Sequence, residues 1–475
     1  MTNPGNALAI IVLALWIPIT FFLFSRYRPA LAGALAVVGG ALLLPEHVSF
    51  NLPILPDLNK VTIPVFTTIA ATAIFARRKL SDTKAFEGID AIFFVIPLGD
   101  IGMWLTNGDT LVTSASKTVR MGLGAYDFFG QVVIDVMVIY GTYFAGRMLF
   151  TRMSDVIAFV RVMFGFGLLY ACLALIEFRF SPQLHTWTYG FMQSDFMHAA
   201  RAGGYRPMGF VQHGLVFARV MAIGLLSGLL LWRLNLLGRR GMIALAIATL
   251  IFTFCKSLGA LILFVAMAPL VVLAQAQMHR RVLFALAMIV AIYPIARGLD
   301  YVPVDEMLDM AASIEQQRAD SMRTRFDNEA ELLERARERL WFGWGGFGRS
   351  LLYDDWGKVN SIVDGEWIGV IGYRGIVGYL GHYGLFLLPI FLAVRRLKAL
   401  QSTEHAIVLG GFALITTLLA IDTIPNATSN LPHFFWSGAL AGAAQGFVRE
   451  DQRLRRDRLR ERKERLAAEA DPAAA

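Results

Sequence analysis

The sequence predicts an all-α polytopic membrane protein with about twelve or thirteen transmembrane helices and one large periplasmic loop that contains amphipathic helices. Hydrophobic residues make up 56% of the 475-residue chain and charged residues only 17%, whereas about a quarter of a soluble domain is charged. The apolar residues also come in runs of about 20, the length a helix needs to cross a hydrocarbon core of roughly 30 Å. Because lipid offers no hydrogen-bond partners, such runs must be helices, whose backbone groups bond within the segment.

Thirteen apolar runs along the chain are the expected spans. They lie near residues 6–24, 29–45, 61–76, 89–104, 128–146, 155–176, 209–232, 242–255, 258–276, 282–296, 376–394, 406–424 and 430–448. Several runs are shorter than a full span, so the expected count is twelve or thirteen. Together they define a transmembrane domain over residues 1–448, which a charged tail follows over residues 449–475.

Basic residues gather in alternate connections between these runs. They are Arg26 and Arg28; Arg77, Arg78 and Lys79; Arg147 and Arg152; Arg233, Arg239 and Arg240; Arg280 and Arg281; and Arg395, Arg396 and Lys398. By the positive-inside rule, these connections and the Arg-rich tail are cytoplasmic and the N-terminus lies outside. The same topology explains the net charge of +8, because basic residues at the cytoplasmic edge meet anionic lipid. We therefore expect a bacterial inner-membrane protein that contacts membrane lipids and binds no nucleic acid.

Several common catalytic and energy-coupling motifs are absent from the sequence. It has no Walker loop, no dinucleotide fingerprint, no His-x-x-x-His or Cys-x-x-Cys pair and no Gly-x-Ser-x-Gly elbow. Cys172 and Cys255 fall in or beside apolar runs and define neither a disulfide framework nor a metal site. An ATP-driven pump and a zinc protease therefore have no support, and we expect no metal and no cofactor.

The outward connection at residues 297–375 is far longer than the others. Connections longer than about 15 residues are usually functional or disordered. From Asp305 to Leu340, apolar residues recur among charges at the spacing of one or two amphipathic helices. Such helices lie on a membrane surface or cover a cavity. This loop is thus the first place to look for chemistry.

A strip of glycines and aromatic residues, Trp341–Arg349, follows the amphipathic pattern, and Asp364 and Glu366 follow the strip. Glycines allow close backbone approach, and aromatic rings offer flat apolar faces that suit sugar rings. A belt of Trp residues at the lipid headgroups is the alternative interpretation.

Charged residues also mark the segment RAGGYRPMGFVQHGLVFAR, residues 201–219. Arg206 lies at the outer rim of a span, and His213 and Arg219 lie deeper. Ionisable groups inside a span are costly and are functional by default. His213 is equally well explained as an interior histidine with satisfied hydrogen bonds. Arg219 is expected to have a partner or a water-filled cavity.

Four cations are expected at the outer surface. They are Arg206, Lys256, Arg323 and Arg325, and Lys256 lies in the short outer turn between two spans. Cations that converge on a phosphate are the expected means of holding a diphosphate leaving group. A lysine at a helix end also reaches toward the headgroups for structural reasons alone.

Four segments resemble the family of O-antigen ligases and of O-antigen and exopolysaccharide polymerases. RPMGFVQHGLVFA is similar to the element that places an arginine ahead of a Gly-Phe pair opening a span, and CKSLGA to a Ser-Arg-Gly turn. RTRFDNEAELLERARERLWFGWGGFGRS resembles the start of the family's large periplasmic loop, and VDGEWIGVIGYRGIVGYLGHYGLFLLPI the loop exit and next helix. The resemblance covers roughly residues 200–395 and depends on the order and spacing of the motifs.

The resemblance implies a periplasmic glycosyl transfer without nucleotide sugar or metal. In this family an undecaprenyl-diphosphate-linked glycan is the donor and a sugar hydroxyl the acceptor. By position, Arg206 and Arg325 would contact the diphosphate and Lys256 would be a third cation. Ligases have a His at the loop exit as the candidate base, whereas this chain has Asp364 and Glu366 there.

The predicted function is therefore a polymerase of exopolysaccharide, capsule or O-antigen. Asp364 or Glu366 is expected to be the general base, and His382, about four turns farther along, is expected deep in a span. Predicted substrate-binding residues are Arg206, His213, Lys256, Arg323 and Arg325. Expected partners are the lipid-linked oligosaccharide, the acceptor glycan and other polysaccharide assembly proteins.

Three alternatives stay open: an O-antigen ligase, a transporter or flippase of lipid-linked glycan, and a scaffold for polysaccharide assembly. Convergence of Arg206, Lys256, Arg325 and Glu366 on one outward-open cavity would favour the enzyme. A cavity between both leaflets, with pseudo-symmetric halves, would favour the transporter.

Overall fold

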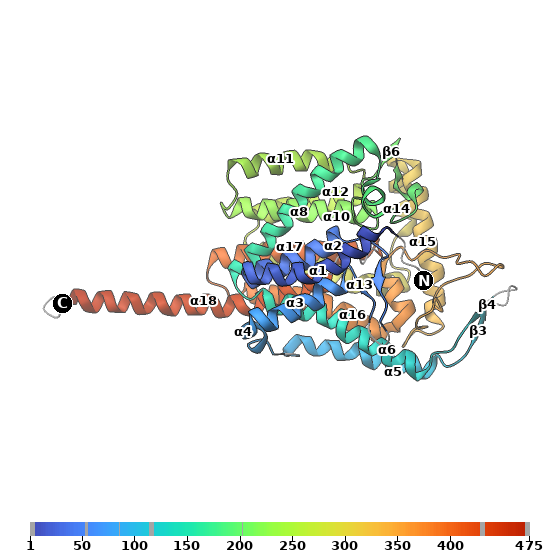
Figure 1. Cartoon of the computed structure of the whole chain (residues 1–475), viewed down its shortest axis with the longest axis horizontal. Coiled ribbons are helices and arrows are strands. Elements are labelled where there is room, and N and C mark those ends of the chain that lie inside the picture. The colour runs from blue at the N-terminus through green and yellow to red at the C-terminus, as the bar shows by residue number, and fades with distance from the viewer. Residues whose placement is uncertain are drawn as a thin grey trace.

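Long helices that run side by side make up most of the molecule (Figure 1). The computed structural model describes residues 5–52, 56–84, 86–113, 118–201, 203–427 and 433–470. Within these residues the strands form three two-stranded antiparallel sheets. The pairs are β1 (Ser49–Phe50) with β2 (Leu58–Asn59), β3 (Leu111–Thr113) with β4 (Thr118–Arg120), and β5 (Ala200–Arg201) with β6 (Gly204–Tyr205). The predicted all-α class is confirmed.

In the described part of the chain, eight helical segments are long and apolar enough to cross a membrane. They are α1 (Ala7–Arg26), η1 with α5 (Gly88–Thr106), α6 through α7 (Ala125–Leu149), α8 (Met153–Phe180), α10 (Gly214–Arg233), α13 (Ala276–Gly298), α16 (Glu366–Leu397) and α17 (Thr403–Asp422). Shorter apolar helices are α2 (Pro29–Leu43), α3 (Thr62–Phe75) and α12 (Leu258–Leu273). Together these segments indicate a multi-pass membrane protein.

Helices α11 (Arg239–Thr253) and α18 (His433–Ala470) occupy the two remaining runs, so each of the thirteen expected runs carries a helix. Helix α18 is 38 residues long. It continues from the last expected span into the charged tail without interruption, and its far part projects from the bundle (Figure 1). The charged tail is therefore helical as far as Ala470.

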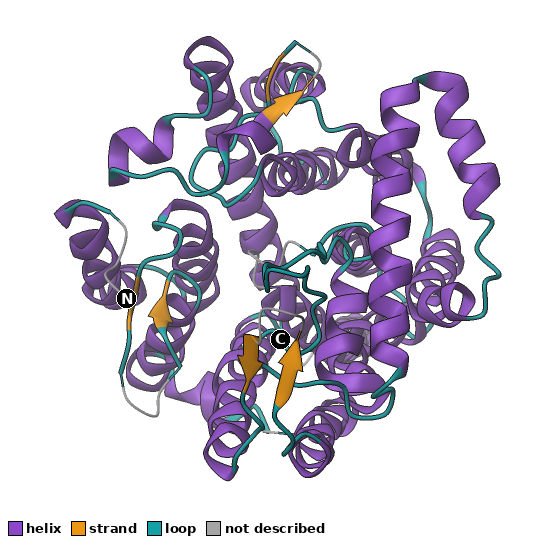
Figure 2. Ribbon diagram, turned by 90° about the vertical axis from the view of Figure 1, so that its right-hand side faces the viewer, coloured by secondary structure: helices purple, strands orange, loops and turns teal. Residues whose placement is uncertain are grey.

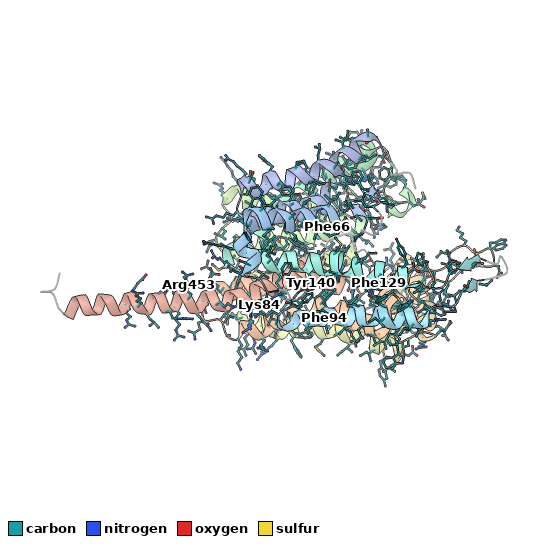
Figure 3. All side chains as sticks on the ribbon, turned by 60° about the horizontal axis from the view of Figure 1, so that its bottom comes forward. Phe66, Lys84, Phe94, Phe129, Tyr140 and Arg453 are labelled. Carbon is teal, nitrogen blue, oxygen red and sulfur yellow. The ribbon has the colours of Figure 1, made fainter. Side chains whose placement is uncertain are left out.

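The sides of the bundle carry large apolar side chains. Phe94 is 53% exposed and Phe129 is 65% exposed, and both lie along the bundle in Figure 3, whereas Arg453 lies on the projecting part of α18. Apolar patches of this extent are rare on soluble monomers. Lipid contact explains why these rings are not buried against other helices.

The two ends of the bundle differ in the way the predicted topology requires. Helix α4 (Arg77–Ser81), which carries basic residues of one expected cytoplasmic connection, lies at the end from which α18 projects (Figure 1). The N-terminus, β3, β4 and β6 lie at the opposite end. We call this opposite end the outward end, and its periplasmic position stays a prediction of the positive-inside rule.

The large loop folds as two amphipathic helices, as predicted. They are α14 (Val304–Ile314) and α15 (Gln316–Arg337). Leu332, Leu333 and Ala336 of α15 are buried, and α15 packs against α16. Figure 2, which looks onto the outward end, shows two helices lying across the ends of the others. The loop is thus an ordered cover on this end of the bundle.

Helix α16 is broken at Gly375, where φ is 64° and ψ is −172°. Only glycine adopts this backbone region readily. A side chain at Gly375 would overlap the backbone of Trp341 and Phe342 in the glycine-aromatic strip. The helix also begins at Glu366, earlier than the expected start at 376. The expected start of this span at residue 376 is therefore wrong, because a half-helix from the loop precedes it.

The strip supplies hydrogen bonds to the break. The bonds run from Trp344 N to Gly372 O (2.9 Å), Gly345 N to Tyr373 O (2.9 Å), Ile376 N to Leu340 O (2.8 Å) and Val377 N to Trp341 O (3.1 Å). A broken helix leaves backbone groups without their usual partners, and these bonds satisfy them. The expected close backbone approach of the strip glycines is confirmed, since a Cβ on Gly343 would lie 2.5 Å from the backbone of Tyr373.

Candidate functional site

A cavity of about 460 Å³ lies at the outward end of the bundle. Its lining comes from the start of α3, the π-helical segment η2 (Asp135–Tyr140), α7, both halves of α16 and the start of α18. Most lining side chains are apolar, such as Val138, Val370 and Phe434. The ionisable groups of the lining are Glu366, Arg374, His382 and His433. An apolar pocket with a few convergent polar groups is the usual form of a binding site.

Glu366 is the centre of the ionisable group. Its Oε1 lies 3.3 Å from His382 Nε2 and 3.4 Å from His433 Nε2. The three side chains are 12%, 11% and 10% exposed, respectively. They are therefore accessible from the cavity and otherwise enclosed by protein.

His382 lies inside α16, as expected, but its expected separation of about four turns from Glu366 is wrong. In a straight helix, sixteen residues would separate Glu366 and His382 by about 24 Å. The break at Gly375 folds the two halves of α16 back on each other, so the two side chains meet. The sequence showed a glycine at position 375. It did not show that the glycine-aromatic strip would form hydrogen bonds to the helix at this break.

His433 is a site residue that the sequence analysis missed. It is the first residue of α18, at the outer entrance of the last expected span. The sequence contained a pattern that could have identified His433. His213 was chosen as a candidate because it is a histidine near the entrance of a span, and the same is true of His433. Sequence spacing alone does not show that a residue near position 433 meets one at position 366.

Two further bonds fix the position of Glu366. Its backbone N–H donates to Thr423 O at 3.0 Å. The hydroxyl of Tyr383 in turn donates to Thr423 Oγ1 at 3.1 Å. The bond between the start of α16 and the end of α17 thus fixes the backbone that carries the carboxylate. A reacting group must be held in a fixed position of this kind.

Asp364, the other predicted base, has a different environment. Its Oδ1 lies 3.8 Å from Arg325 Nε, and Arg325 also donates to Pro425 O at 2.8 Å. Burial raises the pKa of Asp364 and the nearby Arg325 opposes this rise. Asp364 is not among the described residues that line the cavity. Of the two predicted bases, Glu366 is the one that faces the cavity.

The predicted cations lie at the outward end but do not line the cavity described above. Arg206 Nε donates to the backbone oxygen of Lys256 at 2.9 Å, so these two residues are in contact. Arg325 bonds the Pro425 oxygen instead, and Arg323 is exposed on α15. The expected convergence of all of them with Glu366 on one cavity is absent among the described lining residues. Arg206 and Arg325 each donate to a backbone oxygen outside the cavity lining, of Lys256 and Pro425 respectively.

His213 has a structural role at the start of α10. It is the N-cap residue, and its Nδ1 accepts a hydrogen bond from Leu215 N at 3.2 Å. N-caps satisfy backbone groups at the helix start. The interpretation of His213 as a histidine with satisfied hydrogen bonds therefore agrees with the structure, although it lies before the helix and not within it.

Arg219 has a partner, as was expected for an arginine well inside a span. Its Nη1 lies 2.6 Å from Asp422 Oδ2, and the two side chains are 5% and 11% exposed. The pair joins α10 to α17. The prediction of a partner for Arg219 is confirmed.

A second buried network was not predicted from the sequence. Arg374, which lines the cavity, lies 2.9 Å from Asp100 and 2.6 Å from Asp135. The acids come from α5 and from the π-helical segment η2, and π-helical turns are frequent at functional sites. Acids inside the apolar runs 89–104 and 128–146 were the available signal. The network anchors the first half of α16 just before its break.

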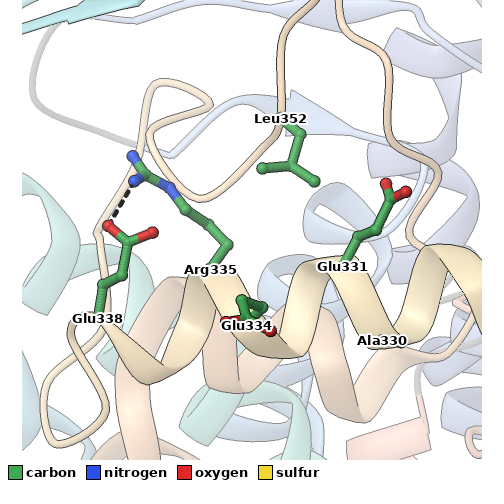
Figure 4. Close-up of a pocket in the computed structure, with 6 residues that line it drawn as sticks. All are labelled: Ala330, Glu331, Glu334, Arg335, Glu338 and Leu352. Carbon is green, nitrogen blue, oxygen red and sulfur yellow. Dashed lines mark hydrogen bonds and ion pairs between the residues drawn. The ribbon is translucent and has the colours of Figure 1, made fainter.

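A second hollow, of about 390 Å³, lies on the surface of α15 and is lined by Glu331, Glu334, Arg335, Glu338, Ala330 and Leu352 (Figure 4). Arg335 pairs with Glu338 at 2.8 Å. Its lining is mainly acidic, so it repels a diphosphate. It is therefore a poor candidate for the donor site.

Glu366, His382 and His433 also form a group that could hold a metal ion. Their ligand atoms all lie within 4.8 Å of one another, and carboxylates and imidazoles are common zinc ligands. The sequence matches no known protein-family model and no curated protein. The function of this cavity must therefore be argued from its own residues.

Proposed function

We propose that this chain is an inner-membrane glycosyltransferase that polymerises a surface polysaccharide from an undecaprenyl-diphosphate-linked glycan. The observation that carries the proposal is Glu366, held between two histidines at the wall of an outward cavity. A carboxylate in that position can accept a proton from a bound hydroxyl. The predicted number of twelve or thirteen spans and a periplasmic large loop belong to the same proposal.

The proposed reaction is a displacement at the anomeric carbon of the donor sugar. The acceptor hydroxyl oxygen forms the new glycosidic bond while Glu366 takes its proton. The bond between the anomeric carbon and the diphosphate oxygen breaks, and undecaprenyl diphosphate leaves with the electron pair. Binding donor and acceptor side by side supplies much of the rate enhancement in reactions of this type.

The histidines and the cavity wall have supporting roles in this proposal. With its Nε2 protonated, His382 donates to Glu366 Oε1, and His433 Nε2 lies 3.4 Å from the same oxygen, so both imidazoles can help to orient the carboxylate. The rings of Tyr373 and Phe434 in the lining offer apolar faces for sugar rings.

The diphosphate is assigned to the cations around the cavity. Arg325 is linked to Asp364, which lies between the lining residues Val363 and Glu366 in sequence, so one guanidinium lies beside the segment that borders the cavity. Arg206 and Lys256 form a second cationic point at the same end. Arginine binds phosphate oxygens in bidentate fashion and so suits a diphosphate leaving group.

The ligase alternative gains support from one observation. Members of the resembled ligases have a histidine at the loop exit, and the break at Gly375 brings His382 to Glu366, which begins α16 at that exit. A transporter has less support, because the described lining residues lie toward the outward end or near the middle of their helices, and none lies at the end from which α18 projects. A polymerase stays the first proposal because a carboxylate is central in the group.

A reconstituted reaction tests the proposal. The purified protein is supplied with undecaprenyl-diphosphate-linked repeat units in the presence of EDTA and without nucleotide. The expected products are longer glycans on the lipid and free undecaprenyl diphosphate. A protein that moves the lipid-linked glycan between leaflets and forms no glycosidic bond would contradict the proposal. In a deletion strain, single repeat units should accumulate, whereas unattached polymer on its lipid would indicate a ligase.

A further inference from the structure

We propose that Glu366, His382 and His433 form a zinc-binding site at the wall of the outward cavity. Metal binding at this site needs no glycosyl transfer and goes beyond the function proposed above. Its consequence for activity, which is inhibition, rests on that function. The inference is carried by the spacing of three ligand atoms and by the open volume beside them.

The spacing of the ligand atoms fits the edges of a zinc site. Zinc bonds imidazole nitrogen at about 2.0–2.1 Å and carboxylate oxygen at about 2.0–2.2 Å in tetrahedral geometry. Two ligand atoms of such a tetrahedron are therefore about 3.3–3.5 Å apart. Glu366 Oε1 lies 3.3 Å from one imidazole nitrogen and 3.4 Å from the other. The third edge, between the two histidines, is within 4.8 Å and closes with a small side-chain rotation.

The same distances are long for direct hydrogen bonds to a carboxylate. Charge-assisted N–H···O bonds are usually about 2.7–2.9 Å long. Both imidazole nitrogens approach the same oxygen, Oε1, at the longer distances given above. Three ligand atoms from separate segments that lie around a common point are the arrangement expected of ligands around an ion.

The fold positions the three ligands from separate segments. Glu366 begins the first half of α16, His382 lies in the second half, and His433 begins α18. The Gly375 break and the bond from Glu366 N to Thr423 O hold the first two in place. The cavity of about 460 Å³ beside them leaves room for the open fourth position, usually water, that three-ligand zinc sites keep.

The donor set selects the class of metal. Two imidazoles and one carboxylate suit zinc and neighbouring transition metals. Magnesium and calcium prefer sites made of oxygen atoms, so they should bind here weakly. The outward position of the cavity would allow a periplasmic ion to enter without crossing the membrane.

Bound zinc would oppose the proposed glycosyl transfer. Coordination occupies the lone pair of Glu366 that would accept the proton, and it takes the imidazole nitrogens that orient the carboxylate. Zinc is therefore expected to inhibit the enzyme and EDTA to restore activity. The proposed reaction itself stays independent of metal.

The test is zinc binding to the purified full-length protein, stripped of metal with EDTA and measured by isothermal titration and by metal content. Wild type should bind one zinc ion at this site. Glu366→Gln, His382→Ala and His433→Ala should each weaken binding by more than the roughly 10–100-fold that changes around metal ligands cause. His405→Ala is the matched control, because His405 lies 3.5 Å from Glu450 in a comparable His–Glu contact elsewhere. Magnesium in place of zinc should give no comparable binding.

Equal zinc binding by wild type and all three ligand variants would overturn the site, since the metal would then be bound elsewhere. X-ray absorption at the zinc edge of the wild-type complex gives a second test that needs no variant. It should show two imidazoles and oxygen ligands, and sulfur or oxygen-only coordination would contradict the assignment. Site-specific binding without inhibition would support the metal site and count against Glu366 as the base, which separates the two proposals.

Discussion

Two of the groups of charged side chains inside the bundle differ in what surrounds them. Arg219 and Asp422 form a pair 2.6 Å apart that joins α10 to α17. Glu366, His382 and His433 are about equally buried, yet they face a cavity of about 460 Å³. Burial and charge are common to both groups, whereas of the two only the second is among the described residues that line this cavity. The open volume, more than the cost of a buried charge, is the reason for placing the proposed reaction at the second group.

The largest expected effect is the loss of stability when the Arg219–Asp422 pair is broken. Arg219→Leu leaves Asp422 buried without its cation, and breaking a buried pair costs about 3–5 kcal/mol. We expect a clear loss of thermal stability of the purified protein, and recovery of most of it in the double variant Arg219→Leu with Asp422→Leu. Unchanged stability together with lost glycosyl transfer would instead assign Arg219 to the reaction. The distinction between a structural pair and a reacting group would then be wrong.

The cations near the cavity should affect rate and not stability. Arg206→Ala and Arg325→Ala each remove a proposed diphosphate contact, which is expected to cost about 3 kcal/mol of transition-state stabilisation, or roughly a hundredfold in rate. Lysine at either position should restore only part of the transfer rate, because its ammonium group cannot form the planar, bidentate contact that a guanidinium makes with phosphate oxygens. Arg337→Ala is the control, since Arg337 lies on the same helix as Arg325 but bonds Gly298 O. Near-wild-type turnover in both alanine variants would remove the diphosphate role.

A smaller effect is expected at the break that assembles the cavity group. Gly375→Ala forces a side chain into a glycine-only backbone region, at a cost of about 1–3 kcal/mol, and shifts Glu366 relative to His382. We expect transfer to fall by about tenfold, which corresponds to about 1.4 kcal/mol. Gly165→Ala in α8 is the matched control, because a Cβ there meets no atom within 4 Å. Equal activities of the two variants would show that the break does not position the site.

The fold was predictable to the extent that it depends on apolar runs. Each expected run carries a helix, and the amphipathic pattern before Leu340 folds as α14 and α15. The start of α16 was misplaced because the break at Gly375 depends on bonds to residues 340–345, which are distant from most of the helix in sequence. The helix propensity of a segment depends on its own residues and not on such tertiary hydrogen bonds, so it could not predict the break.

The site was predictable only in part for the same reason. Motifs and topology singled out Glu366, and also Arg206 and Lys256, which are in contact. The contact of Glu366 with His382 and His433 requires a folded-back helix and the approach of α18. Residues that converge from three segments cannot be recognised from spacing along the chain.

The central claim is that Glu366 is the base at the site of glycosyl transfer. The most direct measurement compares the transfer rates of purified Glu366→Gln and Asp364→Asn with that of wild type, on undecaprenyl-diphosphate-linked repeat units at equal protein concentration. Loss of a general base typically costs about 10²–10⁴ in rate, so we expect a loss of this size for Glu366→Gln and a loss below about tenfold for Asp364→Asn. Near-wild-type transfer by Glu366→Gln, or a larger loss in Asp364→Asn, would contradict the account.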